Sequence, residues 1–155
     1  MKQAILVVIV GLMFFSCIDD NLKEQTAEEQ FEADLVVIDN FLSQNNLTAE
    51  IEPNSQLRYI ITQQGLGIYP EDTDSVTVNY VGSLLLTGDI FDEKDTITFK
   101  LNSLISAWRI GLPLLKEGGS MMLYVPSLYG YVNSDIPGIP PGSNIIFDLD
   151  LIEVK

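Results

Sequence analysis

The feature that most constrains the fold is a period-two alternation of apolar and polar residues in the second half of the chain. It is clearest at 145–151, where large apolar side chains at the odd positions are separated by Asp148 and Asp150. Successive side chains of a strand point to opposite faces, so this segment predicts a strand with one apolar and one acidic face. Similar patterns predict further strands over 76–81 and 121–125, and segment 57–62 is also interpreted as a strand.

Another segment repeats with the period of a helix instead. Segment 26–44 begins with Thr26 and Glu29 at the spacing of a capping box, and apolar residues recur at helical spacing from Phe31 to Leu42. We therefore predict an N-terminal amphipathic helix. Its apolar stripe either docks on its own domain or forms a partner face or dimer seam. One short helix has too few heptads for a convincing coiled coil, which favours docking.

A second, shorter helical pattern runs from Ser103 to Leu112, capped by Asn102 or Ser103 and stopped near Pro113. Several strands around one short helix predict an antiparallel α+β fold. The acidic stretches 71–75 and 89–95 lack the central glycine and the closing glutamate of a calcium loop, so we expect solvated loops there.

Charge and composition exclude several function classes. With 8 Lys+Arg against 22 Asp+Glu the net charge is −14, and such a surface repels phosphate, so we expect no nucleic-acid partner. The chain has no histidine, which removes His-dependent catalytic triads and His-ligated zinc or iron sites. A single cysteine leaves no internal disulfide and no thiolate cluster. We expect neither a metal nor a cofactor.

The N-terminus has the pattern of an exported protein. The apolar run from Ala4 to Phe15 is too short to span a bilayer and is typical of a secretory signal. It ends at Ser16-Cys17, and a small residue before a cysteine resembles the lipobox of bacterial lipoproteins. This resemblance implies a signal peptide over 1–16 and a new N-terminus at an acylated Cys17. The alternative is an ordinary signal peptide with an incidental cysteine.

A lipoprotein would carry residues 17–25 as a lipidated tether and attach to a membrane through its acyl chains. We expect a location in the cell envelope, as an outer-membrane lipoprotein on the periplasmic or the surface face. The acidic residues directly after Cys17 resemble the surface-export signal of some Bacteroidota lipoproteins, and a plain solvated tether explains them equally well.

Four motifs within 76–155 together resemble the FKBP family of peptidyl-prolyl isomerases. They are VTVNYVG at 76–82, GDIFD at 88–92, the helix-and-turn segment 104–121 with Ala107 in place of the family's glycine, and IPPGSNIIFD at 139–148. The resemblance implies a twisted antiparallel β-sheet wrapped around one short α-helix. The expected organisation is a helix and linker over 26–53 and an FKBP-like domain over 54–155.

The family's pocket holds a proline ring among aromatic side chains. By the resemblance, the catalytic set is Tyr80, Phe91, Asp92, Trp108, Tyr129 and Phe147, and the substrate-binding set is Ile97, Leu104, Ile105 and Ile139. Trp108 would be the floor, Asp92 the carboxylate near the rim, and Tyr129 the rim tyrosine whose hydroxyl bonds the ligand. The backbone N–H of Ile105 would bind a substrate carbonyl.

The implied activity is cis–trans isomerisation of X-Pro bonds in exported proteins, to assist their folding. This chemistry needs no histidine, metal, cofactor or covalent step. The alternative is a catalytically weak FKBP-like binding or chaperone module of an envelope assembly such as the gliding machinery. The pocket's aromatic residue types favour the enzyme, and the short rim segments at 92–99 and 126–130 favour the binding module.

Overall fold

The structure is a computed structural model that describes residues 26–132 and 136–155. Within them the helices are α1 (Ala27–Gln44) and α2 (Ser106–Gly111), and the strands are β1 (Glu50–Ile51), β2 (Arg58–Gln63), β3 (Ser75–Leu84), β4 (Ile90–Lys100), β5 (Gly119–Val125) and β6 (Ile145–Val154). Short 3-10 turns are η1 (Leu101–Ser103), η2 (Leu112–Leu114) and η3 (Ser127–Tyr129). The predicted signal peptide and tether, with Cys17, lie outside the described residues.

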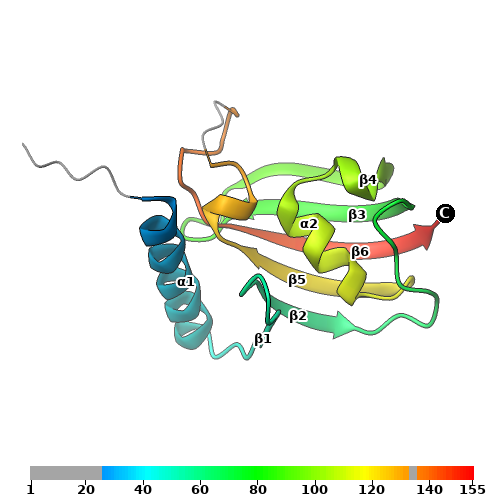
Figure 1. Ribbon diagram of the computed structural model, residues 1–155, viewed down its shortest axis with the longest axis horizontal. Coiled ribbons are helices and arrows are strands. Elements are labelled where there is room, and N and C mark those ends of the chain that lie inside the picture. Colours follow the sequence, from blue (N-terminus) through cyan, green and yellow to red (C-terminus); the bar gives the residue numbers. More distant parts are fainter. Residues whose placement is uncertain (1–25, 133–135) are drawn as a thin grey trace, which may run out of the picture.

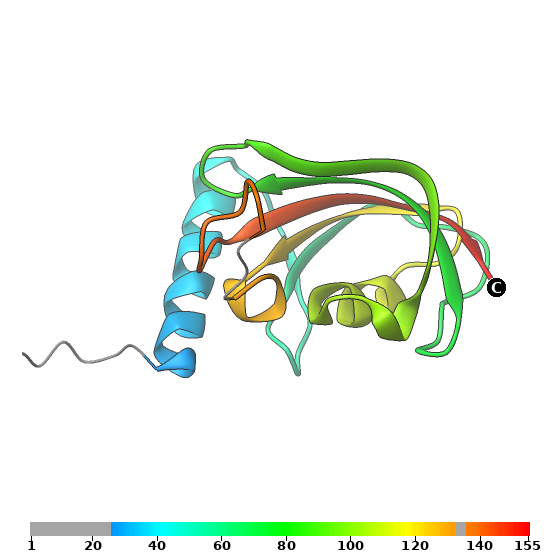
Figure 2. The ribbon, with the colours of Figure 1, turned by 90° about the horizontal axis from the view of Figure 1, so that it is seen from above.

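The strands form one antiparallel sheet in the order β1-β2-β5-β6-β3-β4 (Figure 1). Figure 2 shows the sheet curving around α2, which lies on the concave side, while α1 stands at the end of the sheet opposite to the C-terminus. The predicted α+β fold, with a sheet wrapped around a short helix and an additional N-terminal helix, is confirmed. Neither helix of the described part is long and apolar enough to cross a membrane.

The N-terminal helix forms as predicted, and its apolar stripe is docked. The capping box is complete, since Glu29 N–H donates to Thr26 Oγ1 and Thr26 N–H to Glu29 Oε2, both at 3.1 Å. Further along, Ile38 and Leu42 pack on the outer face of the sheet in a cluster that also contains Leu85, Tyr124 and Ile146.

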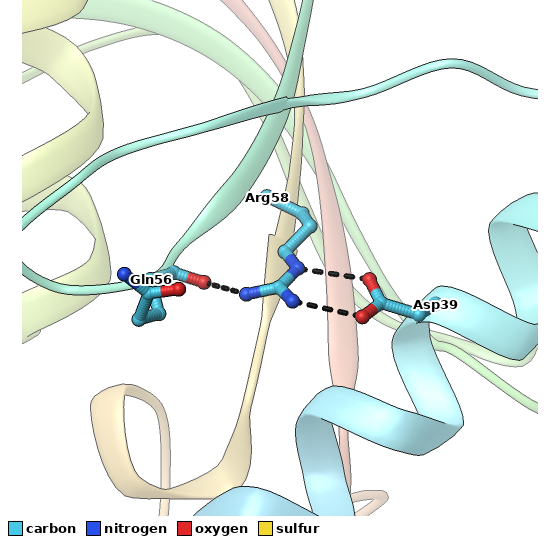
Figure 3. A network of polar contacts seen from close by, with 3 residues as sticks. All are labelled: Asp39, Gln56 and Arg58. Carbon is cyan, nitrogen blue, oxygen red and sulfur yellow. Dashed lines mark hydrogen bonds and ion pairs between the residues drawn. The ribbon is translucent and has the colours of Figure 1, made fainter.

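A two-pronged ion pair adds a directional contact between α1 and the sheet (Figure 3). Arg58 of β2 donates from Nε to Asp39 Oδ1 at 2.9 Å and from Nη2 to Oδ2 at 2.8 Å. Its remaining nitrogen donates to the carbonyl oxygen of Gln56. The Arg58 side chain is only 8% exposed and that of Asp39 is 52% exposed, so the guanidinium is shielded from solvent while the carboxylate lies at the surface.

The alternation in β6 produces one apolar face, as predicted, but the opposite face is only partly acidic. Ile145, Phe147 and Leu149 are buried on the concave face that carries α2. On the other face, Ile146 is buried by α1, whereas Asp148, beyond the helix, is exposed. The outer face of β6 is therefore acidic only where α1 does not cover it.

The expected loop at 89–95 is wrong, because β4 runs through it and pairs with β3. This strand lies at the edge of the sheet (Figure 1), where charged side chains and irregular register are common, so it lacks a clean alternation. The ladder shifts register between Val78 and Tyr80 and between Gly82 and Ser83, and Thr96 has φ = 52°.

The expected start of the second helix is also wrong. Leu101 is fully buried, and the chain turns there through η1 before α2 begins at Ser106. The hydroxyl of Ser103 donates to the carbonyl of Lys100 at 2.7 Å, and Ile105, which offers no side-chain hydrogen bond, is the N-cap.

Candidate active site

A pocket of about 210 Å³ opens on the concave side of the sheet, beside α2. Its lining residues come from β3, β4, β6, the start of α2 and the segment after η3, and they are Tyr80, Phe99, Leu104, Ile105, Trp108, Tyr131 and Phe147. Pockets for drug-sized molecules are about 300–1,000 Å³, so this one fits a group the size of one side chain or ring.

The pocket is built around Trp108, which is the one tryptophan of the chain and is 3% exposed. Its ring centroid lies 5.0 Å from Tyr80, 5.2 Å from Phe147 and 6.2 Å from Phe99, at interplanar angles of 83°, 88° and 82°. Edge-to-face pairs of this kind contribute about 0.5–1.5 kcal/mol each beyond the area they bury. The rings therefore support one another as a rigid apolar surface.

The indole N–H of Trp108 is buried and has no hydrogen-bond partner among the described residues. A buried donor without an acceptor costs about 1–3 kcal/mol. A residue that served only to fill the core could avoid this cost, because phenylalanine or leucine would fill much of the space without a polar atom. The arrangement is more easily explained by a binding role.

A glycine in β3, Gly82, allows the rings of Phe91 and Phe147 to lie close to the backbone. A methyl group at Gly82 would lie 2.6 Å from Cζ of Phe91 and 2.9 Å from Cε1 of Phe147, so the two rings occupy the space that any side chain would need. Phe91 in turn packs edge-on against Phe147 at 5.8 Å and Tyr131 at 6.2 Å. It supports the pocket wall from behind.

One carboxylate adjoins the aromatic wall. The hydroxyl of Tyr80 donates to Asp92 Oδ2 at 2.5 Å, and Lys94 Nζ lies 3.0 Å from Asp92 Oδ1. Burial by itself would raise the pKa of Asp92, but the hydrogen bonds from Tyr80 and Lys94 outweigh it and lower that pKa. Burial is the main cause that raises the pKa of Tyr80 well above its ordinary value of 10.0, and the hydrogen bond to Asp92 raises it further. At neutral pH the pair is a neutral phenol and a carboxylate.

The structure brings together most of the residues that the resemblance implied. Tyr80, Trp108, Phe147, Leu104 and Ile105 line the pocket, and Phe91 and Asp92 contact lining residues. Ile105 is the N-cap of α2, where the first N–H groups have no acceptor within the helix. Three further residues that the resemblance implied, Ile97, Tyr129 and Ile139, do not line the pocket.

The tyrosine that lines the pocket is Tyr131, not Tyr129. The η3 turn directs Tyr129 towards α1, where its ring lies 5.4 Å from that of Phe31. The chain then brings Tyr131 back over the pocket. The two tyrosines are separated by one glycine, so the sequence offered both, and only the direction of the turn distinguishes them.

Phe99 likewise takes the place expected for Ile97. The two residues are two positions apart on β4, and both are half-buried against the same core, but only Phe99 lines the pocket. Ile139 is 4% exposed and lines a neighbouring hollow with Ile90 and Pro140. The aromatic character of Phe99 was visible in the sequence, whereas the position of α2, which brings the Trp108 ring to 6.2 Å from that of Phe99, was not.

Comparison with known proteins agrees with this geometry. A family model described as FKBP-type peptidyl-prolyl cis-trans isomerase matches residues 67–152, which include every residue that lines the pocket and exclude α1.

Curated relatives match about two thirds of the chain at moderate identity. The chain is 39% identical over 103 residues to the FKBP-type peptidyl-prolyl cis-trans isomerase FkpA of Escherichia coli, covering 64% of this chain and 38% of that protein. It is 38% identical over 104 residues to the peptidyl-prolyl cis-trans isomerase Mip of Coxiella burnetii, covering 64% and 45%. The chain therefore spans less than half the length of these curated relatives.

Solved structures extend the similarity beyond the matched domain. The crystal structure of FkpA from Escherichia coli has a TM-score of 0.70 at 30% identity and covers 83% of this chain and 62% of that one. A peptidyl-prolyl cis-trans isomerase from Pseudomonas syringae has a TM-score of 0.68 at 27% identity and covers 80% and 95%.

Proposed function

The chain belongs to the FKBP-type peptidyl-prolyl cis-trans isomerase family, and we propose that it catalyses the cis–trans isomerisation of X-Pro peptide bonds. One observation carries the proposal: the pocket is aromatic and rigid, and it has room for about one ring. Proline is the residue whose side chain is a small apolar ring fused to the reacting amide.

Such a pocket accelerates the rotation without a proton transfer or a covalent bond. Resonance opposes rotation about an amide C–N bond by about 18–20 kcal/mol, while the cis and trans X-Pro forms differ by only about 0.5–1 kcal/mol. Twisting the bond removes the resonance, so the carbonyl oxygen loses negative charge. An apolar wall disfavours the planar, polar amide more than the twisted one, and each 1.4 kcal/mol of this preference is about tenfold in rate.

Each lining group has a proposed task in this chemistry. Trp108 supports the proline ring, while Tyr80, Phe99 and Phe147 exclude water around the amide. The backbone N–H of Ile105 binds a substrate carbonyl. Tyr131, in place of Tyr129, supplies the rim hydroxyl that the resemblance implies. Asp92 holds the hydroxyl of Tyr80 and sets the field at the rim.

The test is the rate of cis-to-trans isomerisation of a short peptide with one Leu-Pro bond, measured with and without the protein. We expect catalysis, and we expect Phe99→Leu to lower kcat/KM several-fold. Phe41→Leu is the matched control, because Phe41 is a half-buried ring against Tyr124 in the cluster under α1. A folded wild-type chain that leaves the rate unchanged would overturn the proposal.

A second candidate, a binding module of an envelope assembly, is favoured by one observation. A hollow of about 560 Å³ lies beside the pocket wall and is lined in part by Ile90, Ile136 and Pro140, more space than a single ring needs. A binding module would retain a proline-free apolar peptide with an affinity that Phe99→Leu does not change. An isomerase would lose turnover in Phe99→Leu and would not bind the proline-free peptide.

The proposed substrates are X-Pro segments of exported proteins, and the proposed location is the cell envelope, reached through a lipid on Cys17. The support for both is the apolar run that ends at Ser16-Cys17. A periplasmic and a surface-exposed face are both compatible with this anchor.

A further inference from the structure

A carboxylate is buried between α1 and the turn that leads to the pocket. Asp34 is 2% exposed, and its Oδ2 accepts hydrogen bonds from Ser127 N–H at 2.9 Å and from Ser127 Oγ at 2.6 Å. Its Oδ1 accepts from Gln30 Nε2 at 2.8 Å. All three donors are neutral groups, and they hold the Asp34 carboxyl group in the interior by directional hydrogen bonds.

Burying such a polar group costs free energy unless well-placed hydrogen-bond donors replace its hydration. The helix is already docked by Ile38 and Leu42 and by the Asp39–Arg58 ion pair. Asp34 adds a directional constraint. Apolar contacts allow the helix to slide, whereas a carboxyl group held by three hydrogen bonds does not. It fixes the position of Ser127 relative to α1.

Ser127 begins the turn from which the chain continues to the pocket. Its N–H lies also within 3.2 Å of Asn144 Oδ1, so the turn is tied to the residue that precedes β6. Two residues on, Tyr129 packs against Phe31 of the same helix. Two residues further, Tyr131 lines the pocket and packs against Phe91. Figure 2 shows η3 lying beside the first turns of α1.

We propose that Asp34 is a positioning residue for the substrate pocket, which acts through Ser127 to place the side chain of Tyr131. The proposal rests on the proposed function, since it assigns Asp34 a task in binding the proline-containing segment. It makes α1, which lies outside the family-matched residues 67–152, a part of the site. The proline floor itself is formed on other elements and does not depend on this contact.

The experiment compares two substitutions that each remove one carboxylate tie of α1. Asp34→Asn removes the tie to the turn, and Asp39→Asn removes the tie to Arg58 on β2. The probe is a short Leu-Pro peptide, and its binding is followed by the fluorescence of Trp108, which reports the pocket because the chain has no other tryptophan. Turnover of the same peptide gives kcat and KM.

We expect Asp34→Asn to weaken peptide binding and raise KM by about two- to tenfold, the effect of losing one well-placed hydrogen bond, with kcat little changed. Asp39→Asn should lower Tm and leave both constants unchanged. A merely structural role for Asp34 would make the two variants alike, with lower Tm and unaltered binding, and this result would overturn the proposal.

A double-mutant cycle tests whether the effect passes through Tyr131. If it does, adding Asp34→Asn to Tyr131→Ala should weaken binding no further, whereas independent effects would multiply and contradict the proposal. If Asp34→Asn fails to fold, Ser127→Ala, which removes one donor, takes its place in the same cycle.

A readout without substrate separates this inference from the proposed function. We expect amide hydrogen exchange at 128–131 to rise in Asp34→Asn and not in Asp39→Asn. A wild-type chain that neither binds nor isomerises the peptide would refute the proposed function. Equal exchange at 128–131 in the two variants would refute the positioning role of Asp34, whatever the activity.

Discussion

At the scale of single residues, the pocket side chains serve the core and the site together. Trp108 lies within 6.2 Å, ring to ring, of Tyr80, Phe99 and Phe147, and it belongs to the main hydrophobic cluster. Truncating it to alanine should cost about 3–5 kcal/mol of stability, so a loss of activity in that variant would be ambiguous. A rim residue that contributes little to packing is a better probe of the chemistry.

Asp92→Asn is such a probe, because asparagine has nearly the same size and the Asp92 side chain is 42% exposed. We expect turnover to fall by about three- to tenfold, since the carboxylate that holds the Tyr80 hydroxyl loses its charge. The melting temperature should change little, because exposed ion pairs contribute little to stability. Both quantities are measured on one preparation. An unchanged rate with a lower melting temperature would remove Asp92 from the site.

The rate should be independent of pH between about 5 and 9, because no group of the site titrates there. The pKa of Asp92 is lowered below its ordinary 3.8, so the stabilising charge is fully present above that value and is lost only as pH falls through the lowered pKa. The pKa of Tyr80 is raised above 10.0, so its phenol stays protonated.

The pH prediction is checked with a rate profile in which Trp108 fluorescence shows that the chain stays folded. The wild-type isomerisation rate should fall only at acidic pH, and the Asp92→Asn rate should show no such fall. A transition near neutral pH in wild type would show that another group controls the step.

At the scale of elements, the two faces of the sheet have different roles. The concave face with α2 forms the pocket and the main cluster, whose buried and supporting members all lie between Leu57 and Val154. The outer face packs α1 against Leu85, Tyr124 and Ile146. The N-terminal helix therefore adds stability without contributing to the pocket floor.

We predict that the fragment 54–155, which lacks α1 and β1, folds alone and retains the proline floor. Deleting α1 removes the burial of Leu35, Ile38 and Leu42, worth about 1.5–3 kcal/mol for each fully buried side chain, so its melting temperature should be lower. Circular dichroism and Trp108 fluorescence test folding and pocket formation against the full chain. A fragment without cooperative melting would make α1 integral to the core and the domain boundary wrong.

At the scale of the whole molecule, the pocket and the predicted anchor are separated along the chain. The helix α1 begins at the end of the molecule far from the C-terminus (Figure 2). A chain with a net charge of −14 is repelled by anionic lipid headgroups, so attachment would depend on the acyl chains.

We predict that Cys17→Ser releases the protein from membranes and leaves isomerase activity intact, because the cysteine serves only as the acyl acceptor. The protein is produced with its own N-terminus, and membranes are washed with carbonate before the wild-type and variant fractions are compared. Ser16→Gly, which keeps a small residue before the cysteine, is the matched control and should stay bound. A Cys17→Ser protein that remains on the membrane would contradict the lipoprotein hypothesis.

The sequence by itself determined the elements whose pattern is local. The alternation predicted β3, β5 and β6, and the Thr26–Glu29 capping box with its apolar stripe predicted α1. These patterns can be recognised without a structure because strand faces repeat every two residues and helix faces about every 3.6.

Only the tertiary structure decided which of two neighbouring residues lines the pocket. Phe99 and Ile97 share one face of β4, and Phe99 lines the pocket because α2 places Trp108 beside it, with the two rings 6.2 Å apart. Tyr131 rather than Tyr129 lines it because α1 holds the intervening turn through Asp34 and Ser127, residues 93 positions apart. Interactions across such distances depend on the folded arrangement of whole elements, and no local spacing in the sequence encodes them.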